Sequence, residues 1–244
     1  MLLKVDGLSK DFGGLRALDS VSFEVKEHEL VGLIGPNGAG KTTLFNCISG
    51  HIPVTEGKIL FDGKDITGLP PHQRAKLGLA RTFQVYAAQG DLNVLEYTMV
   101  GAFLRTNGRR KAKDIALETL KELDLLAWKE RKVSEIPVPG QKLVTMAVAV
   151  ATNPKLLLLD EVAAGLNPQE IGWVKGIISH IHKDLGITTV LIEHVMALVM
   201  DISQRVVVLD AGRVIKEGRP QEVVNDPAVI KAYLGESFRL EETR

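Results

Sequence analysis

The stretch GPNGAGKTT at residues 35–43 decides the fold, because it satisfies the pattern G-x-x-x-x-G-K-[ST] and directly follows the apolar run at residues 30–34. A strand that ends in a glycine-rich turn points successive backbone N–H groups inward, and a helix that begins near Gly40 adds the positive end of its dipole. We therefore predict that this loop binds the phosphates of a nucleoside triphosphate. Its residues are Gly35, Pro36, Asn37, Gly38, Ala39, Gly40, Lys41, Thr42 and Thr43.

Two side chains of the predicted loop have roles that follow from their chemistry. Lys41 is long enough to reach the β- and γ-phosphates, and the hydroxyl of Thr42 is a ligand for the Mg²⁺ ion that bridges phosphate oxygens. We expect both cofactors, the nucleotide and Mg²⁺, to bind at this end of the chain.

Composition limits the other classes of function. The 244 residues fit one large domain, or one domain with an insertion, and the single Cys47 excludes a disulfide framework and indicates a reducing compartment. Thirty basic and thirty acidic residues give a net charge of zero, so no overall field favours nucleic acid. The longest apolar stretch, residues 143–151, is far shorter than the ~20 residues that span a bilayer. We expect neither a signal peptide nor a membrane span.

The predicted fold class is α/β, with a P-loop NTPase core and a mostly helical insertion subdomain. Short β patterns at residues 2–5, 21–25 and 58–61 indicate a flanking antiparallel β-subdomain. Unbroken apolar runs at residues 156–159 and 188–192 are typical of parallel strands that are covered on both faces.

The insertion is expected at residues 85–152, within a single domain of residues 1–244 whose α/β core comprises residues 1–84 and 153–244. Helical spacing of apolar residues predicts a helix at residues 114–128. Upstream of that segment is a basic cluster, for which a solvated turn and a contact with lipid or a partner both remain open. Its residues are Arg105, Arg109, Arg110, Lys111 and Lys113.

Polar residues follow the two predicted parallel strands. Asp160 and Glu161 come directly after four leucines, so a hydrophobic strand brings these carboxylates to its C-terminal end. There Asp160 is a candidate ligand for Mg²⁺, and Glu161 a candidate to polarise the attacking water. His194 follows the second strand and could sense the γ-phosphate or be structural. Gln84 is a candidate neutral ligand of the metal or the water.

In this order, the phosphate loop, Gln84, Asp160-Glu161 and His194 resemble the ATP-binding cassette (ABC) family over essentially the whole chain. The resemblance implies one nucleotide-binding domain that binds ATP, with Phe12 as the aromatic residue that stacks on adenine. It also implies that Gln84 lies in the Q-loop, that residues 164–167 form the D-loop, and that His194 is the switch histidine.

A finer resemblance is to the ATPase subunits of branched-chain amino-acid importers. It implies ATP hydrolysis coupled to transport, permease subunits and a second ABC ATPase as partners, and a peripheral position on the cytoplasmic side of the cell membrane. No nucleic-acid partner is expected. The matching segments are residues 12–18, 60–70, 163–168 and 222–236.

One segment departs from the family. Members resemble one another in a signature close to L-S-x-G-Q, whose N–H groups grip the γ-phosphate held by the opposing subunit, but residues 135–142 read EIPVPGQK. Alignment on Gly140 leaves Val138 where the serine belongs, and the ungapped alignment instead puts Pro137 at the serine and Pro139 at the glycine. Because proline lacks an N–H, the sequence predicts a poor signature.

A poor signature damages the ATP site on the opposing subunit's phosphate loop, whereas the site on this chain would borrow the partner's signature. We therefore expect a heterodimer with a cassette that differs from this chain. Two alternatives remain: a non-catalytic or impaired regulatory cassette that binds nucleotide, and a soluble, non-transport ABC ATPase acting on nucleic acid or ribosomes.

Overall fold

The computed structural model describes residues 1–82 and 92–234, and the chain forms two compact units. Unit 1 comprises Met1–Pro70 with Val190–Arg244, and unit 2 comprises Pro71–Thr189. The structure has the α/β architecture expected from the sequence. The expected boundaries of the helical insertion stay a prediction.

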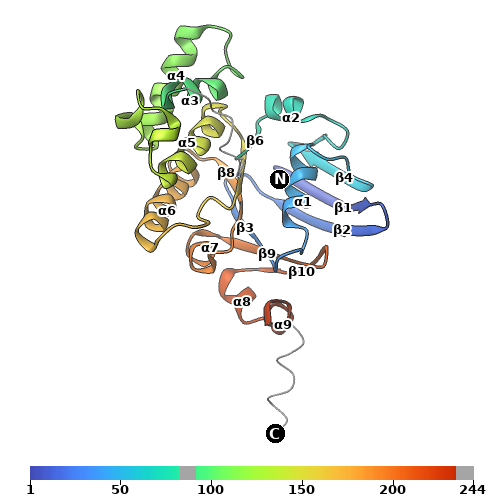
Figure 1. The fold of residues 1–244 in the computed structure, drawn as a ribbon. Coiled ribbons are helices and arrows are strands. Elements are labelled where there is room, and N and C mark those ends of the chain that lie inside the picture. Colours follow the sequence, from blue (N-terminus) through green and yellow to red (C-terminus); the bar gives the residue numbers. More distant parts are fainter. Residues whose placement is uncertain (83–91, 235–244) are drawn as a thin grey trace. The chain divides into compact units, whose positions relative to one another are not determined.

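The antiparallel sheet of unit 1 has the strand order β2-β1-β4-β5 (Figure 1). Leu3 pairs with Val25 on one side and with Phe61 on the other. Buried and exposed residues alternate towards the end of β2, as expected for a sheet with one covered face. The strands are β1 (Leu3–Phe12), β2 (Leu15–Val25), β4 (Glu56–Phe61) and β5 (Lys64–Asp65), each extending or adding to the predicted β segments.

A second sheet has the order β10-β9-β3-β8 in unit 1. β3 runs parallel to β9, and β9 and β10 form an antiparallel hairpin. Every residue of β3 and β8 is buried, as is typical of parallel strands. The bounds are β3 (Leu30–Ile34), β8 (Thr188–Ile192), β9 (Arg205–Asp210) and β10 (Arg213–Gly218).

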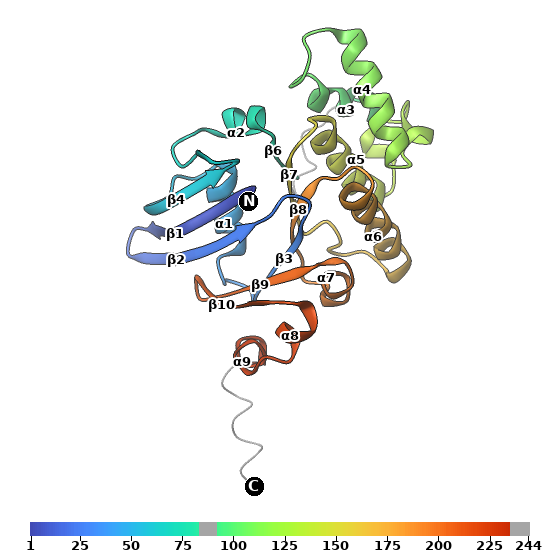
Figure 2. The same ribbon diagram turned by 180° about the vertical axis from the view of Figure 1, so that it is seen from behind.

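The helices of unit 1 complete its apolar core. A buried cluster joins Ile34 of β3 to valines of the sheet and of the C-terminal helices, which lie beside β10 in both ribbon views (Figures 1 and 2). Cys47 lies in the first helix and has no solvent exposure. The bounds are α1 (Lys41–Ser49), α7 (Met196–Ile202), α8 (Pro220–Val224) and α9 (Pro227–Leu234).

In unit 2 the sheet continues in the order β8-β7-β6, so β8 is the strand at which the chain passes from unit 2 to unit 1. β6 (Leu79–Arg81) runs parallel to β7 (Leu156–Asp160), with Arg81 opposite Leu158. β7 is buried along its whole length, as the four leucines predict.

Helices make up most of the rest of unit 2. The side chain of Asn93 caps α3 by accepting a hydrogen bond from the N–H of Glu96. In return the carboxylate of Glu96 accepts a hydrogen bond from the N–H of Asn93, and the two bonds together form a capping box. A second capping box joins Asn167 and Glu170 at the start of α6. The bounds are α2 (Pro71–Leu77), α3 (Val94–Ala102), α4 (Arg109–Glu122), α5 (Val138–Ala151) and α6 (Pro168–Lys183), with 3₁₀ turns at Leu126–Trp128 and Val133–Glu135.

The helix predicted at residues 114–128 is wrong at both ends. α4 begins at Arg109 and stops at Glu122, because Asp124 adopts a left-handed conformation with φ 56°. The N–H of Leu125 then donates to the carbonyl of Leu120 at 2.8 Å, which is the bond of a Schellman cap. The cap carries Leu123 and Leu125 into the core, and both are fully buried.

The predicted basic cluster separates into two parts. Arg105 donates hydrogen bonds to the carbonyl of Thr152, and to that of Asn153 at 3.1 Å, so it caps the C-terminal end of α5. Arg109, Arg110 and Lys111 are exposed in the first turn of α4.

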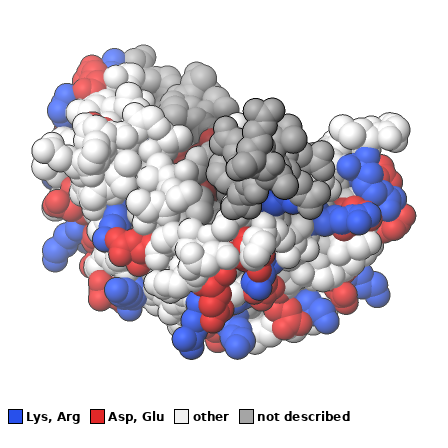
Figure 3. All heavy atoms as spheres, turned by 90° about the horizontal axis from the view of Figure 1, so that it is seen from below, with Lys and Arg blue, Asp and Glu red and all other residues white. Residues whose placement is uncertain are grey.

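Within the described ranges, no helix is both long and apolar enough to cross a membrane. On the face shown in Figure 3, Lys and Arg side chains lie beside Asp and Glu side chains.

His180 links two helices of unit 2 through two carboxylates. Its Nε2 lies 2.9 Å from Glu122 at the end of α4, and its Nδ1 lies 2.8 Å from Asp184 at the C-cap of α6. Burial lowers the pKa of His180, but the hydrogen bonds to Glu122 and Asp184 outweigh burial and raise this pKa above its usual value.

We expect the free energy of unfolding to depend on the ionisation of His180. A histidine whose pKa is higher in the folded state stabilises the protein fully below its unfolded pKa of 6.5, and this stabilisation is lost as the pH rises through the folded value. Urea unfolding at several pH values should therefore show the wild type gaining most over His180→Gln below pH 6.5. A difference that does not vary with pH would contradict the role of the charged histidine, and Glu122→Gln should remove part of the same dependence.

Candidate nucleotide-binding site

The predicted phosphate loop lies in unit 1, between the buried strand β3 and α1. Two of its glycines are required by close backbone contacts. A Cβ atom at Gly35 would lie 2.0 Å from the carbonyl oxygen of Leu209, and one at Gly40, where φ is 100°, would lie 2.8 Å from that of Ala17. The loop keeps this path only because both positions lack a side chain.

Lys41 is buried and closes the loop on itself. Its Nζ donates to the carbonyl oxygens of Gly35 at 2.7 Å and Pro36 at 3.0 Å. The first helical bond runs from the N–H of Leu44 to the carbonyl of Gly40, which supplies no side-chain cap. Helix geometry therefore aims the N–H groups of the first turn out of the helix end, where an anion is stabilised. The predicted metal ligand Thr42 is exposed in that turn.

His194 also belongs to unit 1. It directly follows Ile192 and the buried Glu193 at the end of β8, and β8 is the neighbour of β3 in the sheet. The side chain of His194 is exposed, and its N–H donates to the carboxylate of Glu193 at 3.3 Å. An exposed imidazole at the end of a buried strand can take part in proton transfer and hydrogen bonding.

Phe12 ends β1, and the residue is 48% exposed. The Nζ of Lys10 lies 4.9 Å from the centre of the ring, in a cation–π contact. An exposed aromatic ring of this kind can stack on a nucleotide base. The adenine-stacking role of Phe12 stays a prediction.

Asp160 and Glu161 lie in unit 2, at the end of β7. The Oδ2 atom of Asp160 accepts a hydrogen bond of 2.8 Å from Arg81, in an ion pair whose side chains are 7% and 3% exposed for Arg81 and Asp160. The N–H of Asp160 donates to the hydroxyl of Thr82 at 3.1 Å. Glu161 has φ 51°, a left-handed conformation that is costly for a residue with a side chain.

The second carboxylate oxygen of Asp160 tests whether this residue fits Mg²⁺. Oδ1 is buried and has no hydrogen-bond partner among the described residues, which is costly unless a ligand binds it. A carboxylate oxygen is a preferred ligand of Mg²⁺. Three or more His, Cys, Asp or Glu side chains do not gather into a metal site in the part of the chain that is described. A single carboxylate suits Mg²⁺ because the ion takes its remaining ligands from a hydroxyl, water and phosphate.

Gln84 lies outside the described residues, so its predicted role is untested. Arg81, three residues before Gln84, forms an ion pair with Asp160 that the sequence did not predict. The two side chains are 79 positions apart in the sequence. The available signal was general: a buried Asp at the end of an apolar strand needs a cationic or metal partner.

The segment aligned with the family signature begins α5. Pro137 is the N-cap, and Pro139 lies in the first turn, where its ring nitrogen supplies no hydrogen-bond donor. The ring of Trp128 packs on Gly140, where a Cβ atom would lie 2.3 Å from the indole carbon Cζ3. Trp128 also meets Trp173 of α6 edge to face, with 5.7 Å between ring centroids. Farther along α5, Lys142 is buried, and its Nζ donates to the carbonyl of Ala164 in the predicted D-loop.

Known proteins resemble the chain in sequence and in structure. The ABC transporter family matches residues 18–164, and the branched-chain amino acid ATP-binding cassette transporter family matches residues 213–239. The high-affinity branched-chain amino acid transport ATP-binding protein BraF of Pseudomonas aeruginosa is 39% identical over 97% of this chain and 98% of its own length. LivG of Escherichia coli K12, which has the same descriptive name, is 40% identical over 97% and 98%.

The crystal structure of the ADP conformation of MJ1267, an ATP-binding cassette of an ABC transporter, is 31% identical. It has a TM-score of 0.88 and covers 96% of this chain and 99% of that chain. The chain therefore belongs to the ABC transporter family, and its P-loop NTPase fold is confirmed.

We expect Gly140→Ala to displace Trp128, because the added methyl group would overlap the indole ring. Overpacking of this kind costs about 1–3 kcal/mol of the free energy of unfolding. It should also change the intrinsic fluorescence, since the chain has two tryptophans and both lie at this contact. Urea unfolding followed by tryptophan emission measures both effects.

The matched control is Gly172→Ala in α6, where an added Cβ atom would meet nothing within 4 Å. Alanine there should leave the emission unchanged and stabilise the helix by roughly 0.5–1 kcal/mol. Equal behaviour of the two variants would show that Trp128 does not pack on Gly140.

Proposed function

We propose that this chain is the ATP-binding and ATP-hydrolysing subunit that supplies energy to a membrane importer of branched-chain amino acids. The observation that carries the proposal is the phosphate loop, which holds Lys41 on its own carbonyl oxygens at the start of α1. The names of BraF and LivG support the class of solute. In this proposal the chain is a peripheral subunit on the cytoplasmic side of the membrane, bound to permease subunits.

Binding of ATP begins with the phosphates. The N–H groups of the loop and of the first turn of α1 donate to phosphate oxygens, and Lys41 exchanges the carbonyls of Gly35 and Pro36 for the β- and γ-phosphates. The exchange requires little reorganisation, because the buried lysine already lies along the loop. Phe12 stacks on the adenine.

Mg²⁺, when bound, supplies positive charge that neutralises the phosphates and orients them for cleavage. Thr42 would hold the ion through its hydroxyl, and Asp160 through Oδ1, with Gln84 as a further ligand. Arg81 keeps the other oxygen of Asp160 occupied and so fixes how the carboxylate is turned.

Hydrolysis needs a group that orients and polarises water. Glu161 has that role, because a carboxylate accepts a proton from the water as the oxygen attacks the γ-phosphate. His194 hydrogen-bonds to the γ-phosphate and stabilises the charge that develops there.

Two substitutions separate binding from hydrolysis. Lys41→Ala should weaken binding of ATP with Mg²⁺ about 10- to 100-fold, because charge-assisted hydrogen bonds to the phosphates are lost. Glu161→Gln should retain binding but lower turnover by about 100-fold or more, since an amide is a far weaker base. Nucleotide titration and steady-state phosphate release measure the two effects.

Lys58→Ala is the matched control for Lys41→Ala, because Lys58 is an exposed lysine of the same unit. It should bind ATP like the wild type. Unchanged affinity in Lys41→Ala would remove the phosphate loop from the mechanism, and wild-type turnover in Glu161→Gln would remove that glutamate.

We also propose that the chain works with a second, different ABC ATPase. The start of α5 supports this, because Pro137 and Pro139 withhold donors and Trp128 covers the Cα of Gly140. A homodimer would therefore contain two poor signatures. A mixed dimer would hold one good composite site, built on this chain's phosphate loop and the partner's signature.

Mixing this chain with a partner cassette of intact signature should restore turnover at this chain's phosphate loop. Loss of one preorganised donor costs on the order of a hundredfold in rate, so the homodimer should be slow by comparison. The restored activity should disappear with Glu161→Gln in this chain and persist when the equivalent glutamate of the partner is changed. Robust turnover by the homodimer alone would contradict the asymmetric arrangement.

The same α5 start favours one second candidate, a regulatory cassette that binds ATP without hydrolysing it. Turnover in the mixed dimer distinguishes the two functions, since a regulatory cassette would stay inactive with every partner.

A further inference from the structure

Three backbone segments of unit 1 meet at one point, and the phosphate loop is one of them. The N–H of Asp19 on β2 donates to the carbonyl of Gly212 at 2.9 Å, and the N–H of Gly212 donates to the carbonyl of Ala39 in the phosphate loop at 3.0 Å. A Cβ atom at Gly212 would lie 2.7 Å from the carbonyl oxygen of Ala17, the atom that also excludes a Cβ at Gly40. β2, the β9–β10 turn and the phosphate loop are therefore packed backbone against backbone.

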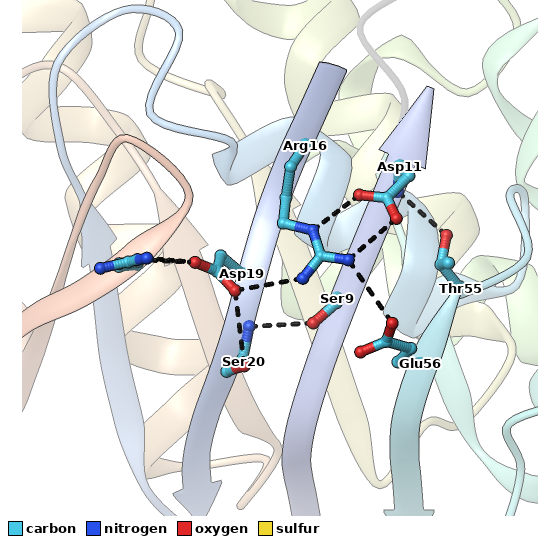
Figure 4. Close-up of polar contacts among 8 residues, drawn as sticks. Ser9, Asp11, Arg16, Asp19, Ser20, Thr55 and Glu56 are labelled. Carbon is cyan, nitrogen blue, oxygen red and sulfur yellow. Dashed lines mark hydrogen bonds and ion pairs between the residues drawn. The ribbon is translucent and has the colours of Figure 1, made fainter. Parts of the chain in front are cut away.

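The carboxylate of Asp19 adds side-chain contacts to this packing of three backbone segments. Its Oδ2 accepts bonds from Arg213 of β10, at 2.8 Å from Nε and 2.5 Å from Nη2. Its Oδ1 lies 3.4 Å from Nη1 of Arg16 (Figure 4). The hydrogen bond from Arg213, with a further contribution from Arg16, lowers the pKa of Asp19 below its usual value. The carboxylate is therefore charged at neutral pH and bridges two guanidinium groups.

Arg16 continues the connection to the end of the hairpin. It faces Asp11 across the strands and donates from Nε to Oδ1 at 2.8 Å and from Nη2 to Oδ2 at 3.0 Å. This two-pronged geometry fixes the carboxylate in the plane of the guanidinium group. Asp11 precedes Phe12, and its own N–H donates to the hydroxyl of Thr55 at 2.9 Å. Hydrogen bonds and ion pairs thus connect the phosphate loop to Asp11, the residue that directly precedes Phe12.

We propose that Asp19 is a positioning residue for nucleotide binding. Together with Arg16 it holds the hairpin of β1 and β2, which carries Phe12, at a fixed place relative to the phosphate loop. The base and the triphosphate are joined through one ribose, which limits the distance between them, so both gain full contact only if their two supports keep a separation that this linker can span. The inference rests on the proposed function, because it takes ATP as the ligand and Phe12 as its base support.

The proposal distinguishes two ligands that share a triphosphate. ATP uses both supports, whereas inorganic tripolyphosphate uses the phosphate loop alone. Loss of the Asp19 contacts should therefore weaken ATP and spare tripolyphosphate. A residue that merely stabilises the fold or the loop would weaken both ligands equally.

The experiment measures the affinities of ATP and inorganic tripolyphosphate, each with Mg²⁺, for the full chain. Asp19→Ala, Arg16→Met and Phe12→Ala should each lower the ATP affinity about tenfold, within the range of one base–aromatic stack, and should change the tripolyphosphate affinity by less than about twofold. The double variant Asp19→Ala with Phe12→Ala should bind ATP about as well as Phe12→Ala alone, because both changes remove the same interaction.

Two further variants serve as controls. Asp19→Asn keeps an acceptor for Arg213 without the charge, so it should fold normally and lose less ATP affinity than Asp19→Ala. Glu217→Gln removes a carboxylate from Arg205 elsewhere in unit 1, and should bind both ligands like the wild type.

Three results would overturn the positioning role: unchanged ATP affinity in Asp19→Ala, equal losses for ATP and tripolyphosphate, or additive losses in the double variant. Failure of the proposed function has a different outcome. In that case the wild type would bind neither ligand, or Lys41→Ala would leave ATP binding unchanged.

Discussion

The packing of the phosphate loop in unit 1 depends on one atom, the carbonyl oxygen of Ala17. It lies so close to Gly40 and Gly212 that neither position can carry a side chain. The contact sets where β2 passes the phosphate loop, and so where α1 can begin. The burial of Lys41 and its bonds to Gly35 and Pro36 follow from that path, because the lysine extends back along the loop from the first helical residue. The most constrained point of the unit is thus a steric one.

Local patterns predicted the parts of the structure that local physics determines. The phosphate loop, α1 and the buried strands β7 and β8 were predictable because a glycine pattern or an apolar run specifies each of them within ten residues. The end of α4 was missed, since apolar spacing does not reveal that Asp124 would take a left-handed conformation and close a Schellman cap. Gln84 lies outside the described residues, so its role remains a prediction.

Contacts between distant side chains could not be predicted from the sequence. Arg81 meets Asp160 because β6 and β7 are neighbours in one sheet, whereas Asp19 meets Arg213 because β2 of one sheet packs against β10 of the other. A charged residue in a strand has many possible partners before the register is known. The prolines at the start of α5 are the opposite case. The sequence showed the loss of donors directly, whereas the cover that Trp128 gives Gly140 required the fold.

The burial of Cys47 has a practical consequence for work on this protein. The chain has a single thiol, and that thiol lies with no solvent exposure in α1, the helix that begins at the phosphate loop. A thiol reagent can reach it only when that helix opens, so the rate of its modification measures the local opening of the nucleotide unit. Ligands that close the loop on α1 would then be recognised by the protection they give to one sulfur atom. The rate at which Cys47 reacts therefore reports how often α1 opens.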